Sequence, residues 1–289
     1  MTNLKSHQQR NSSTQKPNIV IIGAGKVGNT FQKIFTSNSY NVTLIGRDIA
    51  TKQQAISNAA LVLITTTDQA IEAVCETIST YLTSDTIVSH CSGALNSDVL
   101  LNAKGQGCMI ASSHPLNTFP SLAASLTTFS NNEHGTYLYC EGDKKALTLL
   151  DSIFSSVGFK VVEIPSNAKM AYHAACVFAC NYLTILMDIS LQTAQLEGIN
   201  KKQFWQAIQP LVQSTLNNIS EHGTTQSLSG PIARGDAQTV SSHVELLANN
   251  NSEISEIYIK LAQQALNLAQ QQGRLSDDKL KALKTLLND

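Results

Sequence analysis

The stretch "NIVIIGAGKVG", residues 18–28, decides the fold of the first half of the chain. Its first six residues are an apolar run that ends in glycine, which is typical of a buried strand. Gly23, Gly25 and Gly28 follow with the spacing G-x-G-x-x-G. In this spacing the first glycine permits a tight turn, the second lets a pyrophosphate approach the backbone, and the third lets helix and strand pack closely. The stretch predicts a dinucleotide-binding loop; a glycine-rich turn without a ligand is the alternative.

Strand and helix patterns alternate outward from this loop. Strands are predicted at 18–23, 41–46, 61–67, 86–93, 108–115, 136–142 and 160–164, and helices at 26–37, 68–82, 97–103 and from Asp143. Strands this apolar, alternating with helices, form parallel sheets that are covered on both faces. We therefore expect the carboxyl ends of the strands to meet at one edge, where ligands bind.

The pattern changes after Ile164, because no strand-like run follows it. Helices are predicted at 166–197, 201–220, 237–249, 252–272 and 276–287. The sequence thus predicts three parts, which are a polar tail at 1–16, a Rossmann-type α/β domain at 17–165 and an all-α domain at 166–289.

Composition limits the class of function. The 289 residues are 42% hydrophobic and 14% charged, which suits two packed cores and not a disordered chain. The net charge is -1 without a Lys/Arg run, so no nucleic-acid partner is expected. The tail lacks the apolar core of a signal peptide, and the apolar run 174–187 is short for a membrane span. Six cysteines without a CxxC pair indicate reduced thiols and no metal site. We expect a cytoplasmic protein that does not bind membranes.

Two stretches beside the first strand predict the cofactor. The loop residues expected to hold the pyrophosphate are Gly23, Ala24, Gly25, Lys26, Val27 and Gly28. The second strand ends in "GRD", where an arginine suits the 2′-phosphate of NADP and an acid suits the ribose of NAD. Arg47 therefore favours NADP(H) over NAD(H). The alternative is that Arg47 is a solvated charge and Asp48 binds the ribose.

The third strand ends in "TTTD" at the same predicted edge. Its residues Thr65, Thr66, Thr67 and Asp68 are expected to line the nicotinamide-ribose side. Asp68 is also a candidate cap for the helix that follows, and the two roles are compatible.

Histidines follow the next two predicted strands, His90 in "HCSG" and His114 in "SSHPLNTF". A single histidine is more often structural than catalytic, but two at neighbouring strand ends make contact with substrate a reasonable hypothesis. Ser92 and Gly93 form a turn that offers a hydroxyl and amides to a substrate carboxylate or carbonyl.

An apolar helix carries polar residues in "KMAYHAACVFACNYLTILM", residues 169–187. Lys169 and His173 are four residues apart and share a helix face, and Asn181 lies two such steps further on. An ammonium beside a bound keto group stabilises the charge that grows on its oxygen and supplies the proton, and His173 is a candidate to share this task. The alternative is that Lys169 extends its amine to solvent and His173 bonds within the core.

A Gly/Pro-rich loop, "LSGPIARGD" at 228–236, interrupts the later helices. Arg234 is a candidate to bind a substrate carboxylate with two parallel hydrogen bonds. It is equally suited to pair with Asp236 within the loop.

Five segments together resemble a bacterial family that joins a Rossmann-like NADP-binding domain to a helical domain, over about residues 17–289. The segments are "GAGKVG", "HCSGAL", "SSHPLNTF", "KMAYHAACVFACNY" and "LSGPIARGD". The helical part resembles the C-terminal domain of the 6-phosphogluconate dehydrogenase-like superfamily, which includes ketopantoate reductase and pyrroline-5-carboxylate reductase. This resemblance implies a homodimer through the helical domain. It also implies a catalytic Lys169, but His173 stands where the superfamily often has asparagine.

The resulting hypothesis is an NADPH-dependent reductase of a small 2-keto acid, with 2-dehydropantoate as the substrate that the resemblance names. Imine reduction of the pyrroline-5-carboxylate type is an alternative. A prephenate-like dehydrogenase is another, because the "SHP" around His114 resembles those enzymes. A protein that binds NADP without catalysis is the alternative from a different class.

Overall fold

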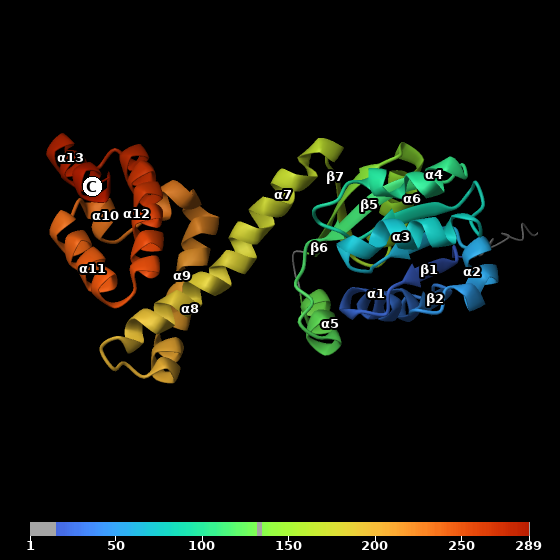
Figure 1. The fold of residues 1–289 in the computed structure, drawn as a ribbon, viewed down its shortest axis with the longest axis horizontal. Coiled ribbons are helices and arrows are strands. Elements are labelled where there is room, and N and C mark those ends of the chain that lie inside the picture. The colour runs from blue at the N-terminus through green and yellow to red at the C-terminus, as the bar shows by residue number, and fades with distance from the viewer. Residues whose placement is uncertain (1–15, 132–134, 289) are drawn as a thin grey trace, which may run out of the picture. The chain divides into compact units, whose positions relative to one another are not determined.

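The computed structural model describes residues 16–131 and 135–288. Two compact units divide this chain, one ending at Val177 and the other beginning at Phe178 (Figure 1). The first turns of the long helix, which the sequence pattern assigned to the helical domain at 166–289, therefore pack with the sheet. The predicted order, an α/β part followed by an all-α part, is confirmed.

The first unit is built on a seven-stranded sheet with the order β2-β1-β3-β4-β5-β6-β7. The strands are β1 (Ile19–Ile22), β2 (Val42–Ile45), β3 (Leu61–Ile64), β4 (Ile87–His90), β5 (Met109–Pro115), β6 (Thr136–Gly142) and β7 (Phe159–Glu163). Strands β1 to β5 pair in parallel, so their carboxyl ends meet at one edge. The sequence pattern predicts that ligands bind at this edge.

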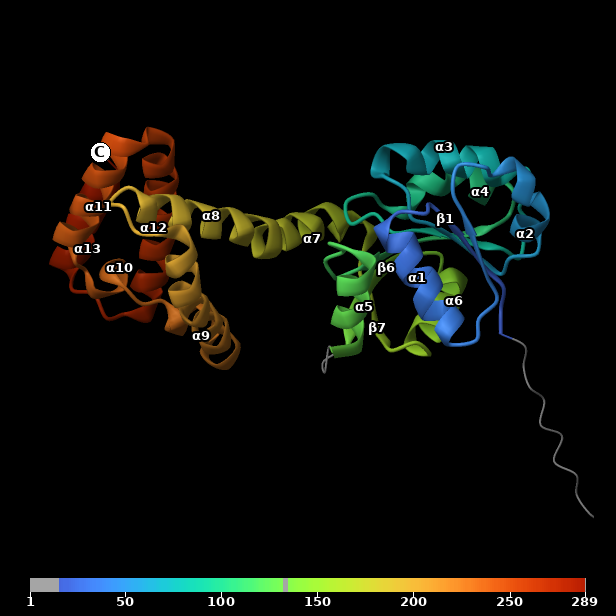
Figure 2. The same cartoon turned by 90° about the horizontal axis from the view of Figure 1, so that it is seen from below.

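Helices cover both faces of the sheet (Figure 2). They are α1 (Lys26–Ser37), α2 (Gln53–Ser57), α3 (Asp68–Ser79), α4 (Leu101–Gly105), α5 (Leu122–Asn131) and α6 (Lys144–Ser155). Alternate residues of β1 point to opposite faces, so Ile19 and Ile21 join one core and Val20 and Ile22 the other.

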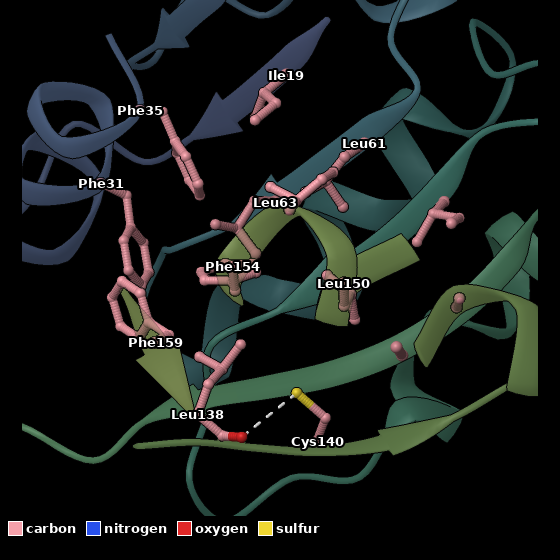
Figure 3. Close-up of a cluster of buried hydrophobic side chains, with 14 of the residues drawn as sticks. Ile19, Phe31, Phe35, Leu61, Leu63, Leu138, Cys140, Leu150, Phe154 and Phe159 are labelled. Atoms are coloured by element: carbon pink, nitrogen blue, oxygen red, sulfur yellow. Dashed lines mark hydrogen bonds between the residues drawn. The ribbon is translucent and has the colours of Figure 1, made fainter. Parts of the chain in front are cut away.

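Aromatic rings fill the core beneath α1 and α6 (Figure 3). The rings of Phe31 and Phe35 lie 5.5 and 5.2 Å from that of Phe154, in edge-to-face contact. Burial of these rings holds α1, and therefore the glycine loop before it, against one face of the sheet.

Strand β6 departs from the predicted all-parallel sheet, because it pairs antiparallel with β5. Its partners are Ala111–Pro115, and the last three of these residues extend beyond the part of β5 that pairs with β4. Strand β7 is parallel to β6 and ends with Glu163 opposite Cys140, which in turn faces Ser113. The chain therefore leaves the sheet level with the carboxyl end of β4, and α7 (Lys169–Cys176) begins there.

The second unit is helical. Its helices are α8 (Tyr182–Gln195), α9 (Lys201–Ser227), α10 (Pro231–Arg234), α11 (Ala237–Asn250), α12 (Ser252–Gln272) and α13 (Asp277–Asn288). Leu266, Val240 and Leu283 belong to a core shared by α10 to α13. Helix α9 contains a non-helical residue, Gly223, with φ 75°.

A turn of π-helix at Val177–Asn181 joins α7 to α8. The whole helical stretch Ser166–Gln195 is long and apolar enough to cross a membrane by length and composition alone, a longer segment than the run at 174–187 considered from the sequence.

Candidate active site

The glycine loop has the geometry that its spacing predicts. Gly23 has φ 118°, a conformation that L side chains rarely adopt, and a Cβ there would lie 2.8 Å from the Thr65 carbonyl carbon. A Cβ on Gly28 would overlap the carbonyl oxygen of Gly23. A Cβ on Gly25 would meet no atom within 4 Å. Two glycines are thus required by the protein's own packing, whereas Gly25 leaves open space above the loop.

Two side chains hold the loop in place. The Thr65 hydroxyl donates to the carbonyl oxygen of Gly23 at 2.8 Å. The Asn29 amide donates to the carbonyl oxygens of Ala24 and Gly25 at 2.7 and 2.8 Å. Thr65, just after β3, therefore supports the loop, and its predicted place on the nicotinamide-ribose side stays a prediction. Asn29 was missed from the sequence; a polar residue four positions after Gly25, in the first turn of the helix, was the available signal.

These residues fit a dinucleotide. Helix α1 begins at Lys26, directly after Gly25, and an anion is favoured at this end of a helix. The Thr66 hydroxyl, just beyond β3, is a buried oxygen with no hydrogen-bond partner among the described residues. Arg47 is exposed just beyond β2, which is next to β1 in the sheet.

Asp68 and Ser92 bond to each other. The Ser92 hydroxyl donates to the Asp68 carboxylate at 2.9 Å and accepts from the backbone amide of Leu95 at 3.0 Å. These bonds fix the turn after β4, and the substrate contact predicted for Ser92 stays a prediction. The N-cap of α3 is Thr67, without a side-chain hydrogen bond, and Asp68 is the first residue of the helix.

His90 is a structural residue of the same turn. It is 0% exposed, Nε2 donates to the Asn96 carbonyl at 3.0 Å, and Nδ1 accepts from the Ser92 amide at 3.1 Å. Burial lowers the pKa of His90 to about 4, so the ring is neutral at pH 7. Both ring nitrogens are used, which leaves His90 no role toward substrate.

Lys169 is buried beneath the site. It is 1% exposed, and Nζ donates to the Ser92 carbonyl and the Ser112 hydroxyl, each at 2.8 Å. Burial lowers the pKa of Lys169, and the nearby Glu141 carboxylate opposes that shift. Glu141 is itself buried and accepts from the Ser97 amide and hydroxyl. The lysine thus ties α7 to the ends of β4 and β5, and it does not extend to solvent as the alternative supposed.

Four rings gather where β5, β6 and α7 meet. His114 Nδ1 lies 2.8 Å from the Tyr172 hydroxyl, and Tyr172 stacks on Tyr139 with centroids 4.6 Å apart. The rings of His114 and His173 are 6.3 Å apart at an interplanar angle of 88°. Tyr172 was missed from the sequence, although its position three residues after Lys169 places both on one helix face.

Gly93 gives these rings room. A Cβ on Gly93 would lie 2.6 Å from His173 Nδ1 and 3.0 Å from His114 Nε2. His173 Nδ1 is buried and has no hydrogen-bond partner among the described residues. Burial, reinforced by the charge of Lys169, lowers the pKa of His114 to about 4. The structure thus brings together Lys169, His173, His114 and Gly93, and their catalytic and substrate roles stay predictions.

Asn181 and Arg234 belong to the second unit. Asn181 is exposed at the end of the π turn, and Arg234 is exposed at the end of α10. Asp236 accepts hydrogen bonds from the Thr239 amide and hydroxyl, which lower its pKa and cap α11. No ion pair joins Arg234 to Asp236 among the described residues. The predicted catalytic role of Asn181 and the predicted substrate contact of Arg234 stay predictions.

Comparisons with known proteins show the fold. Residues 136–265 match a family model described as a domain of unknown function, DUF2520. No curated protein matches the chain in sequence. A Bacteroides fragilis protein named as a proposed NADP oxidoreductase is 18% identical with a TM-score of 0.69, covering 88% of this chain and 99% of that one.

Two further solved structures have the same architecture. Protein TM1727 from Thermotoga maritima is 23% identical with a TM-score of 0.69, covering 89% of this chain and 100% of its own. Pyrroline carboxylate reductase from Plasmodium falciparum, solved with NADP bound, is 13% identical with a TM-score of 0.57, covering 88% and 99%. The chain therefore has the two-part fold of NADP-binding oxidoreductases, a Rossmann-like sheet unit followed by a helical unit.

Proposed function

We propose that this protein is an NADPH-dependent reductase of a small 2-keto acid, with 2-dehydropantoate as the substrate and pantoate as the product. The observation that carries the proposal is the placement of two features at one edge of one unit. A dinucleotide-type loop follows β1, and a cluster of His114 on β5 with Tyr172 and His173 on α7 lies beside the buried Lys169 side chain. The choice of 2-dehydropantoate rests on the resemblance of the sequence motifs.

The loop residues Gly23 to Gly28 would hold the cofactor's pyrophosphate, and NADPH, when bound, supplies a hydride. The keto carbon gains that hydride, its oxygen gains a proton, and a 2-hydroxy acid results. The protein's task is to bind the keto oxygen, which becomes negative during the reaction, and to deliver the proton.

The polar cluster is suited to that oxygen. The Lys169 amine lies in a buried setting, where a positive charge on it would stabilise a nearby negative oxygen more strongly than in water. His114 is a neutral ring at pH 7, so it acts as a hydrogen-bonding group and is not a stored acid. Direct proton donation by Lys169 or His173, and carboxylate binding by Arg234, are the remaining parts of the proposal.

Arg47 supports NADPH over NADH. The prediction is that Arg47→Ala weakens NADPH binding by about tenfold or more, because a bidentate arginine–phosphate contact is lost, and leaves NADH binding unchanged. Titration of the variant with each cofactor, followed by cofactor fluorescence, measures both affinities. Equal losses for both cofactors would assign the 2′-phosphate to another residue.

A homodimer through the helical unit is part of the proposal. Seven large apolar side chains on α8, α9 and the π turn are exposed, namely Phe178, Tyr182, Ile185, Trp205, Leu211, Leu216 and Ile219. A largely apolar cavity of about 500 Å³ opens between α8, α9, α11 and α12. Exposed apolar surface of this extent marks an interaction site, and a second copy in the cytoplasm is the partner we propose.

The test of function is a spectrophotometric assay of NADPH oxidation with purified protein. 2-Dehydropantoate is the expected substrate, other 2-keto acids form a comparison series, and pyrroline-5-carboxylate tests imine reduction. A second arm offers prephenate with NADP⁺. If only pyrroline-5-carboxylate or only prephenate is turned over, the protein is an imine reductase or a prephenate-like dehydrogenase, and the keto-acid proposal is wrong. Tight NADPH binding without turnover in any arm favours a non-catalytic binding protein.

A further inference from the structure

We propose that Glu141 is a positioning residue that acts through Lys169: its carboxylate, held by Ser97, keeps the Lys169 side chain charged and fixed at Ser92 and Ser112. The inference rests on the proposed function only for the use of that charge, which is to stabilise the oxygen of the keto acid. The charge itself, and its dependence on Glu141, concern the chain without substrate.

Glu141 and Lys169 are exceptions in the interior of the protein. Among the residues that the structure describes, Glu141 is the one buried acid and Lys169 the one buried amine, with 2% and 1% of their surfaces exposed. A buried charge without a partner is strongly unfavourable, whereas two opposite charges in one site offset part of that cost for each other. One acid and one amine buried in the same unit therefore indicate a pair.

The register of the β5–β6 pair brings the two groups to one place. Ser112 on β5 lies directly opposite Glu141 on β6, so both side chains point to the same face of the sheet. The Lys169 Nζ atom donates to the Ser112 hydroxyl at 2.8 Å. The amine thus reaches the residue that faces Glu141. No direct ion pair joins Lys169 and Glu141 among the described residues, so their attraction acts across Ser112.

Hydrogen bonds fix the carboxylate of Glu141. Oε1 accepts from the Ser97 amide at 2.7 Å, and Oε2 accepts from the Ser97 hydroxyl at 3.0 Å. Donors on both oxygens favour the ionised form of a carboxylate. Ser97 is itself buried and begins the short 3-10 helix Ser97–Leu100 that follows β4. The negative charge therefore has a defined position before any ligand binds.

No other acidic group around Lys169 is placed to replace Glu141. Burial lowers the pKa of Lys169, and Glu141 is the group that opposes this shift most strongly. Asp68 at the start of α3 is exposed, so solvent screens its carboxylate. Burial raises the pKa of the Cys91 and Cys140 thiols, which are therefore uncharged at pH 7.

The titratable groups on the other neighbouring elements complete the surroundings. Burial lowers the pKa of His90 and of His114 to about 4, so both rings are neutral at pH 7. His173, on α7 itself, lies against the His114 ring. A second acid near Glu141, Asp98, is exposed. The buried amine is therefore the cation that the buried carboxylate faces.

Glu141→Gln isolates the charge, because the amide keeps the shape of the side chain and still accepts from the Ser97 backbone. Glu163→Gln is the matched control, since it removes an exposed carboxylate on the neighbouring strand β7, where it pairs with Lys144. Carbon–nitrogen correlations of the lysine Cε and Nζ atoms in the full chain report whether each amine is charged. The Lys169 signal is assigned by its loss in Lys169→Met.

The expected result is a charged Lys169 at pH 7 in the wild type and in Glu163→Gln. In Glu141→Gln, Lys169 is expected to become neutral at a lower pH than in the wild type, because the effect of burial is no longer opposed. A neutral Lys169 in the wild type at pH 7, or an unchanged titration of Lys169 in Glu141→Gln, overturns the inference.

Urea unfolding gives a second readout, which also serves if one single variant folds poorly. The double variant Glu141→Gln/Lys169→Met is expected to lose less resistance to urea than the sum of the losses in the two single variants, because it leaves no buried charge without a partner. A single variant that does not fold, beside a double variant that does, shows the same coupling. Losses that simply add would contradict the pairing.

The pH dependence of turnover gives the third readout. Glu141→Gln is expected to lower kcat for keto-acid reduction by about tenfold at pH 7 and to regain activity as the pH falls, because the amine regains its proton. The same loss at every pH would make Glu141 merely structural and contradict the inference. If Lys169 changes its charge as expected but the wild type reduces no keto acid, the proposed function fails while the pairing stands.

Discussion

At the scale of single residues, Gly25 and Gly28 separate what the fold needs from what a ligand needs. A Cβ at position 28 meets the Gly23 carbonyl, whereas a Cβ at position 25 meets nothing. We predict that Gly28→Ala lowers the melting temperature and weakens NADPH binding together. Gly25→Ala is predicted to leave the melting temperature unchanged and weaken NADPH binding by about tenfold or more, because its methyl group fills the space for the pyrophosphate.

Thermal melting and fluorescence titration of the two variants measure both quantities. Full NADPH affinity in Gly25→Ala would mean that the pyrophosphate does not approach this loop.

The lowered pKa of His90 predicts how the free energy of unfolding depends on pH. Its pKa is about 4 in the folded chain and about 6.5 when unfolded, so the unfolded chain binds more protons between these values. The stabilisation from neutral His90 is therefore complete above pH 6.5 and is lost as pH falls towards 4.

Urea unfolding at pH 7 and pH 4.5 measures this loss. Because Gln does not titrate, His90→Gln is predicted to lose about 2 kcal/mol less free energy of unfolding between the two pH values than the wild type. Equal losses in both proteins would show that His90 ionises in the folded state.

At the scale of elements, β3 supports the glycine loop through one hydroxyl. Thr65→Val keeps the shape of the side chain and removes its hydrogen bond to Gly23. The expected cost is about 1 kcal/mol in the free energy of unfolding, with weaker NADPH binding because the loop is less well held. Thr77→Val, on the exposed side of α3, is the matched control. If Thr65→Val binds the cofactor as tightly as the wild type, the Thr65 hydroxyl does not support the loop.

Sequence periodicity predicted most elements of the first unit but not the direction of β6. The apolar strands and the glycine spacing are local patterns, so β1 to β5 and their helices could be assigned from short windows. A strand has the same alternation in either direction, and the direction of β6 depends on where the connection after Pro115 returns to the sheet. The reversal of β6 brings α7 to the site. The contacts between α7 and the strands therefore could not be predicted from sequence periodicity.

In the candidate site too, some residues could be predicted from local sequence and their contacts could not. Lys169, His173 and His114 could be identified because polar residues on an apolar helix or at a strand end need a reason. Their partners could not, since Lys169 bonds residues 77 and 57 positions away in the chain. Such pairings are set by tertiary packing. The bond between the Ser92 hydroxyl and Asp68, 24 positions apart in the chain, could likewise not be predicted.

At the scale of the whole molecule, the exposed apolar helices predict association. Phe178 is 71% exposed and Ile185 is 53% exposed. We predict a dimer by size-exclusion chromatography with light scattering, and dissociation to monomers in Ile185→Glu, because a buried unpaired carboxylate is costly. Lys202→Glu, which changes an exposed charged position in the first turn of α9, is the control. A monomeric wild type at micromolar concentration would contradict the proposed partner.

The most direct measurement is a crystal structure of the chain with NADP⁺ and pantoate bound. The account predicts the pyrophosphate against the Gly25 backbone and the pantoate hydroxyl beside the cluster of His114 and His173. A nicotinamide ring on the far side of the sheet edge from these histidines, or a loop with no dinucleotide, would contradict it.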